Sequence, residues 1–241
     1  MKILSSFSTK MPGTDPHLYP VLLVLYMIGV IIGDDYMTII MYNVTDGTLW
    51  EIRMKVSREQ AAQNHERIVE TAAKLFRERG FEGIGVADLM KEAGLTHGGF
   101  YGHFSSKEDL IAEASARALM RSLTVMSKVA EHAPGDPLSA VAAAYLTSRH
   151  RDNPGAGCLL AALGPDVSRQ GPVVRRSVTD YVRGAVDLLT TMVRGQSKAA
   201  RRRKALSTYA TLVGTMVMAR AVDDRALSQE ILDAGLASVK A

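Results

Sequence analysis

A segment rich in glycine and aromatic residues, residues 96–110, places the strongest constraint on how this chain folds. It reads THGGFYGHFSSKEDL, and three of its residues, Gly98, Gly99 and Gly102, each cost roughly 1 kcal/mol relative to alanine in a helix. Such a cluster indicates a short helix whose backbone approaches a partner closely. The nearby aromatic, histidine and lysine side chains suit contact with DNA phosphates. The alternative is an ordinary loop, but helical patterns flank the segment on both sides.

The pattern before this segment predicts two helices. Apolar residues recur at helical spacing over about residues 57–79, and Gly80 follows as a stop signal. A shorter helix is expected over about residues 86–93, ending at Gly94. Two helices joined by a short turn that contains glycine form a helix-turn-helix, with Thr96 capping the second of them. The expected core of this unit consists of Phe76, Leu89, Phe100 and Phe104.

The residues after this unit predict an anion-binding helix start. Ser105 and Glu108 have the spacing of a capping box, so a helix is expected to begin there and continue toward Met126. Lys107 falls in its first turn, where the helix dipole disfavours a cation unless an anion shares the site. Backbone N–H groups and Lys107 together would clamp a phosphate. The alternative is a solvated lysine paired with a nearby acid.

The rest of the chain also predicts helices, over about residues 138–150, 172–194, 203–222 and 227–239, with a glycine-bounded segment at residues 157–166. Abundant Ala, Leu, Val and Met with few aromatic residues favours an all-α fold. The stretch 172–194 carries a broad apolar stripe, and 203–222 is apolar nearly all round. We expect these two helices to pack as a four-helix bundle across a dimer axis.

Charge alone does not locate a nucleic-acid surface. The net charge is +4 and the isoelectric point is near 9.2. Residues 54–121 carry ten basic and ten acidic side chains, whereas residues 122–241 carry sixteen basic and ten acidic ones. The basic excess therefore lies in the second half, so the residue spacing has to identify the DNA-binding part.

Residues 1–53 differ from the rest of the chain. The apolar run 21–32 is twelve residues long, shorter than the roughly 20 that span a bilayer, so a membrane anchor is disfavoured. A β-branched and aromatic stretch, residues 36–44, and a turn-like Thr-Asp-Gly follow. We expect the native protein to begin at Met54, with residues 1–53 as an extension outside the native fold, 54–121 as the helix-turn-helix domain and 122–241 as the regulatory and dimerisation domain.

The chain resembles the tetracycline-repressor (TetR/AcrR-type) family of bacterial transcriptional regulators. The similarity covers about residues 58–121 and includes a motif G-x-x-Y-x-H-F-x-x-K-x-x-L. A weaker similarity lies in the GC-x-L-A-A-L segment at 157–163 and in residues 218–224. The resemblance implies an N-terminal three-helix DNA-binding domain with a recognition helix, followed by a larger helical domain that binds a ligand and forms a homodimer.

Carried onto this sequence, the resemblance implies two groups of DNA-binding residues. The first faces base edges or nearby phosphates and consists of Thr96, His97, Gly98 and Gly99. The second fixes the phosphate backbone and consists of Tyr101, His103 and Lys107. Family members often have Ser or Thr where Gly85 and Gly99 stand, and Ala where Met90 stands. His97 has an alternative as a solvent-facing histidine with no contact to DNA.

The function that the resemblance implies is a sequence-specific DNA-binding regulator, a repressor that a small-molecule effector releases from a near-palindromic operator. The alternative is a helical small-molecule sensor or binding module without DNA recognition. Five residues are candidates for lining a ligand pocket, although core packing explains each of them equally well. They are Met120, Tyr145, Cys158, Tyr181 and Met216.

Other chemistry finds little support in the sequence. No serine elbow, phosphate loop or pair of catalytic carboxylates is present, so we expect no enzyme, no cofactor and no metal site. The single cysteine, Cys158, permits no internal disulfide and favours the cytoplasm. It is either a small buried side chain or a redox-responsive thiol. The basic cluster at residues 201–204 is expected to be a solvated face.

Overall fold

From residue 58 onward the described chain is helical. The computed structural model describes residues 25–32, 37–43, 49–54 and 58–240. The helices are α1 (Arg58–Arg79), α2 (Val86–Glu92), η2 (His97–Gly102), α3 (Lys107–Glu131), α4 (Pro137–Tyr145), α5 (Ser148–Asp152), η3 (Pro154–Ala156), α6 (Leu159–Ser168), α7 (Pro172–Met192), α8 (Lys198–Ala221) and α9 (Arg225–Lys240). The predicted all-α fold is confirmed for residues 58–240.

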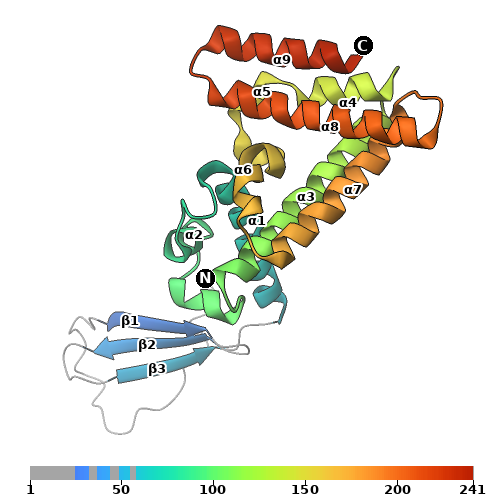
Figure 1. The fold of residues 1–241 in the computed structure, drawn as a ribbon. Coiled ribbons are helices and arrows are strands. Elements are labelled where there is room, and N and C mark those ends of the chain that lie inside the picture. Colours follow the sequence, from blue (N-terminus) through green and yellow to red (C-terminus); the bar gives the residue numbers. More distant parts are fainter. Residues whose placement is uncertain (1–24, 33–36, 44–48, 55–57, 241) are drawn as a thin grey trace, which may run out of the picture.

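A small antiparallel sheet, which the sequence analysis did not predict, precedes the helices (Figure 1). Its strands β1 (Leu25–Ile32), β2 (Met37–Asn43) and β3 (Leu49–Met54) pair in sequence order. The β1 register shifts between Met27 and Gly29, and β1 lies beside η2. The described part of the apolar run 21–32 is thus a strand. The expected turn at 45–47 lies outside the described residues, and the proposal that residues 1–53 are an extension stays a prediction.

The helix-turn-helix forms at the predicted place because glycines end α1 and α2, the two helices that precede η2. Gly80 and Gly94 have φ angles of 81° and 70°, which a residue with a side chain rarely adopts. Gly85 occupies the N-cap of α2. The predicted core is confirmed, since the four residues Phe76, Leu89, Phe100 and Phe104 are at most 5% exposed.

The long helices α3 and α7 lie side by side, and α8 and α9 cross their far end (Figure 1). Within α3 the chain passes residues 121 and 122 without a break, so the proposed domain boundary falls inside a continuous helix. Arg117 of α3 reaches α1, where its Nη2 donates to Glu66 Oε1 at 2.9 Å. These contacts make α3 the element that joins the two halves of the helical chain.

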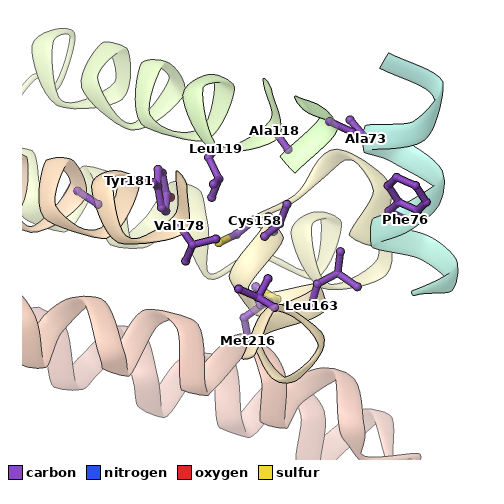
Figure 2. Close-up of a cluster of buried hydrophobic side chains, with 14 of the residues drawn as sticks. Ala73, Phe76, Ala118, Leu119, Cys158, Leu163, Val178, Tyr181 and Met216 are labelled. Carbon is purple, nitrogen blue, oxygen red and sulfur yellow. The ribbon is translucent and has the colours of Figure 1, made fainter. Parts of the chain in front are cut away.

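One buried cluster runs through both halves. Figure 2 shows Ala73 and Phe76 from α1 at one end of it, and Tyr181 and Met216 from α7 and α8 farther along. Cys158, 3% exposed, lies between them. The helix-turn-helix is therefore not an isolated unit but shares its apolar core with the helices that follow.

Three local predictions need correction. Ser106, rather than Ser105, caps α3, because its Oγ accepts a hydrogen bond from the Asp109 N–H. The helix expected over 138–150 is interrupted after Tyr145, and Thr147 caps a separate α5 through the His150 N–H. Finally, α8 begins five residues earlier than expected, because Ser197 supplies an N-cap to Ala200.

Candidate functional site

The predicted recognition element is a short 3₁₀ helix with one exposed face. Thr96 occupies the N-cap position of η2 but makes no side-chain capping bond, contrary to the prediction. Tyr101 is 68% exposed, and the ring of His97 lies 6.3 Å from the Tyr101 ring, centroid to centroid. Phe100 is buried beneath them and holds η2 on the core.

The residues predicted to face base edges divide into two groups. Thr96, His97 and Gly98 are exposed, as a contact with DNA requires. Gly99 is buried on the inner side of η2, so the structure does not present it to a partner, contrary to the expectation.

Lys107 is the first residue of α3 and lies next to the exposed face of η2 in the chain. Its Nζ is 3.4 Å from Oε2 of Glu82, whose side chain is 88% exposed. Glu82 is thus the acidic partner that the alternative prediction for Lys107 requires. An exposed pair of this kind contributes about 0 to 1 kcal/mol, so a phosphate can replace the carboxylate at little cost. The N-terminal N–H groups of α3 stand beside the same lysine.

His103 is half-buried and faces other aromatic rings. Its ring centroid is 5.9 Å from that of His65, and His65 stacks on Phe104 at 4.7 Å. Burial, and secondarily the charge of His65, lowers the pKa of His103 below its ordinary value. A neutral imidazole offers a phosphate an N–H donor but no positive charge.

A cavity of about 340 Å³ lies among α1, α3, α4, α5, α7 and the segment 153–158. Three of the predicted pocket residues line it, namely Tyr145, Cys158 and Tyr181. The other two predictions are wrong. Met216 is fully buried in the core, and Met120 is 66% exposed. The cavity face of α3 includes Ala118 and Ser122. Met120 lies two positions from each of them, so its side chain points to the other side of the helix.

Polar groups surround Cys158. Its N–H donates to Nε2 of His150 at 2.9 Å, and its Sγ is 3.9 Å from the Tyr209 hydroxyl. The Tyr209 hydroxyl in turn donates to the Tyr181 hydroxyl at 3.2 Å. Burial is the main reason that the pKa of both Tyr181 and Tyr209 is raised, so these phenols stay protonated at neutral pH.

The arginines of this cavity were not predicted from the sequence. Arg77, Arg121 and Arg149 all line it, although they come from α1, α3 and α5. Arg77 is only 8% exposed. One signal was available in the sequence. The helical pattern of α1 places Arg77 among apolar neighbours near the end of the helix.

The described residues form neither a metal-binding cluster nor a membrane-spanning helix. In the described ranges 25–32, 37–43, 49–54 and 58–240, no cluster of three His, Cys, Asp or Glu side chains is arranged to hold a metal ion. None of the helices in this part of the chain has the length and apolar character that crossing a membrane requires.

The helix-turn-helix of this chain matches a known family. Residues 68–114 fit the model of the bacterial regulatory proteins of the tetR family. The resemblance expected from the sequence, to the TetR family, is thus confirmed for these residues of the helix-turn-helix domain. The chain is 33% identical over 75 residues to the uncharacterized HTH-type transcriptional regulator YerO of Bacillus subtilis, covering 31% of this chain and 26% of YerO. It is 29% identical over 83 residues to the regulator AcrR of Shigella flexneri, covering 34% of this chain and 39% of AcrR.

The similarity to solved structures extends farther along the chain. Escherichia coli NemR in its reduced form superimposes with a TM-score of 0.63 at 25% identity, covering 74% of this chain and 95% of NemR. A TetR regulator from Chloroflexus aurantiacus superimposes with a TM-score of 0.64 at 22% identity, covering 76% and 96%. The sequence matches to the first curated relatives span only 26 to 39% of their length. The helical fold of the second half is thus shared with TetR-family structures, while its sequence has diverged.

Proposed function

We propose that this protein is a sequence-specific DNA-binding transcriptional regulator of the repressor type. The observation that carries the proposal is the exposed face of η2, where His97 and Tyr101 stand on a buried Phe100, next to Lys107 at the start of α3. A short helix of this kind enters a major groove, and the cation beside it contacts the phosphate backbone. The match of residues 68–114 to the tetR family of bacterial regulatory proteins supports the same function.

We further propose that two copies act together on a near-palindromic operator. A symmetric dimer places two recognition helices one turn of DNA apart. Large apolar side chains are exposed on α7 and α8, as a dimer surface on these helices requires. They are Val173, Leu206, Val217 and Met218. The cavity beside Tyr145 would bind the effector, and binding would favour a dimer whose heads no longer fit the operator.

Lys107 gives a direct test. The assay is a gel shift with DNA from upstream of the protein's own gene, at several salt concentrations. In Lys107→Ala, loss of one phosphate contact should weaken binding to all sequences about tenfold and reduce the salt slope by about one. Lys198→Ala at the start of α8 removes the same charge far from η2 and is the matched control. Equal affinity and equal salt slope for the Lys107 variant and the wild type would contradict the phosphate contact.

The cavity also favours a second candidate, a ligand sensor without DNA recognition. Such a protein would bind small molecules but retain no genomic fragment. Sequencing the fragments that the purified protein retains separates the two functions, because a regulator enriches a small set of sites and a sensor enriches none.

A further inference from the structure

The cavity described above combines an apolar wall with an excess of positive charge. Its apolar side is built from α3 and α4, by Ala118, Val125, Met126, Val129, Val141 and Ala144. Three guanidinium groups, those of Arg77, Arg121 and Arg149, belong to the same lining, and among the described residues that line it there is no Asp or Glu. Fixed charges of one sign in a hollow attract a ligand of the opposite sign.

Among the described residues, no carboxylate lies within hydrogen-bond reach of Arg77. Its Nε donates to the carbonyl oxygen of Gly155 at 3.0 Å, and its Nη2 donates to the same oxygen. A neutral carbonyl satisfies donors but does not balance the charge of a side chain that is only 8% exposed. Burial, followed by the charge of Arg121, lowers the pKa of Arg77, although the more distant carboxylates of Glu70 and Glu78 act in the opposite direction.

Arg121 is only weakly balanced. Its Nη1 lies 3.7 Å from Glu70 Oε2, at the outer limit of an ion pair, and its side chain is 69% exposed at the cavity mouth. The same Glu70 also approaches Arg117, with Oε1 at 3.5 Å from Nη1. Glu70, which does not line the cavity, is therefore shared between Arg117 and Arg121, and the cavity side remains positive.

Tyr145 adds a hydrogen-bond donor to the same cavity. Its hydroxyl is buried beside the Cys158 thiol, a weak hydrogen-bond group, and makes no hydrogen bond of ordinary geometry with the described residues. Burial raises the pKa of this phenol, so it carries a proton. Buried donors in native proteins almost always have an acceptor, and a ligand oxygen can supply one.

We propose that this cavity binds an organic anion, a carboxylate with an apolar aliphatic or aromatic body. The carboxylate lies toward Arg77, Arg121 and the Tyr145 hydroxyl, and the apolar body lies against α3 and α4. The inference rests on the proposed regulatory function for its biological meaning, but the binding itself does not depend on DNA recognition.

The position of Arg77 also gives the anion a route to the DNA-binding half. Arg77 belongs to α1, the first helix of the helix-turn-helix domain, and Gly155 belongs to η3, which α1 contacts. An anion that accepts hydrogen bonds from Arg77 competes with the Gly155 carbonyl. Binding therefore weakens a link that fixes the helix-turn-helix against the rest of the protein.

Calorimetry with matched acids and alcohols tests the proposal. The probes are hexanoate, phenylbutyrate and decanoate, each paired with the alcohol of the same carbon skeleton, so that the members of a pair differ in charge but hardly in size. At least one acid should bind ten times more tightly than its alcohol, since a charge-assisted hydrogen bond is worth at least this factor. Equal affinities within every pair, or no measurable binding of any of the three acids, would overturn the proposal.

The variant Arg121→Met locates the binding site. It removes one charge from an exposed side chain and keeps most of the apolar stem, so the fold should be retained. It should weaken the acid about tenfold and leave the alcohol unchanged. Arg194→Met removes the same charge from an exposed loop outside the cavity and should change neither affinity. Equal acid affinity in Arg121→Met and wild type would refute the assigned site.

A gel shift on the same samples separates this inference from the proposed function. A protein that binds DNA but shows no preference for acids remains a regulator and refutes the anion site. A protein that prefers acids but retains no DNA confirms the anion site and refutes the regulator.

Discussion

The imidazole of His150 accepts a hydrogen bond from the backbone N–H of Cys158, with 2.9 Å between the two nitrogens. The other ring nitrogen, Nδ1, donates to the carbonyl of Tyr145 at 2.7 Å. Both bonds exist together only when the ring is neutral and the proton is on Nδ1. His150 thus ties the end of α4 to the start of α6 through one defined tautomer.

This arrangement predicts a pH-dependent stability. Burial, the main cause, and the charge of Arg220 lower the pKa of His150, while the bond to Tyr145 raises it by less. The folded state therefore binds a proton less readily than the unfolded state, whose histidine pKa is about 6.5. The free energy of unfolding should be highest above that pH and fall as the pH decreases below it.

The variant His150→Gln isolates this contribution, because an amide can donate to Tyr145 and accept from Cys158 without titrating. The decrease in melting temperature as the pH is lowered from about 8 to about 5.5 should be smaller in this variant than in wild type. His103, whose pKa is lowered as well, should maintain part of the dependence. His97→Gln on the exposed face of η2 is the control. A wild-type pH profile in His150→Gln would contradict the assigned role.

Substitutions at two neighbouring residues of η2 should affect stability and DNA binding separately. Phe100 is 1% exposed and Tyr101 is 68% exposed. Phe100→Ala leaves a cavity in the core and should lower the free energy of unfolding by about 3 to 5 kcal/mol. Tyr101→Ala should leave the melting temperature unchanged and weaken DNA binding in the gel shift. A destabilised Tyr101 variant with normal DNA affinity would reverse this assignment.

The contact between α8 and α9 depends on Gly235. A Cβ added there would lie 2.5 Å from Cγ2 and 3.0 Å from Cβ of Thr215. Overpacking of this kind costs about 1 to 3 kcal/mol, so Gly235→Ala should unfold at a lower denaturant concentration. Thr215→Ala removes Oγ1 and Cγ2 and leaves only the contact with Cβ. In the double variant the two losses should therefore be less than additive, and strict additivity would show that the helices separate instead.

Methionines with similar exposure on different helices test the proposed dimer. Met218 on α8 is 58% exposed, and Met120 on α3 is 66% exposed. A buried unpaired charge strongly disfavours association. Met218→Glu should therefore shift the protein toward the monomer in light scattering, whereas Met120→Glu should not. A dimer that is stable in the Met218 variant and lost in the Met120 variant would place the interface on α3.

Much of the helical fold follows from local signals in the sequence. Gly80 and Gly94 end helices because their backbone conformation excludes a side chain, and this can be recognised from sequence alone. The aromatic core, including Phe76 and Phe100, follows from helical periodicity. The break after Tyr145 has no glycine or proline to announce it. It depends on the Thr147 cap and on His150, whose partners are fixed only by the folded chain.

The site was predictable to different degrees in its two parts. The exposed face of η2 is continuous in sequence, so the place of Lys107 in the first turn of a helix identified it, and the family resemblance identified Tyr101. The cavity draws its lining from helices far apart in the chain, and no local pattern shows which faces converge. For this reason Arg77 and Arg121 were missed, and Met120 and Met216 were assigned to the pocket incorrectly.

The unbroken course of α3 has a mechanical consequence. Its 25 residues form a rod about 37 Å long, with Lys107 at one tip and the cavity wall near the other. A rod cannot tilt at one end alone, so a small rotation around the cavity is amplified into a larger sideways displacement at the tip. Displacements of an ångström or two suffice to take a cation out of hydrogen-bond range of a phosphate.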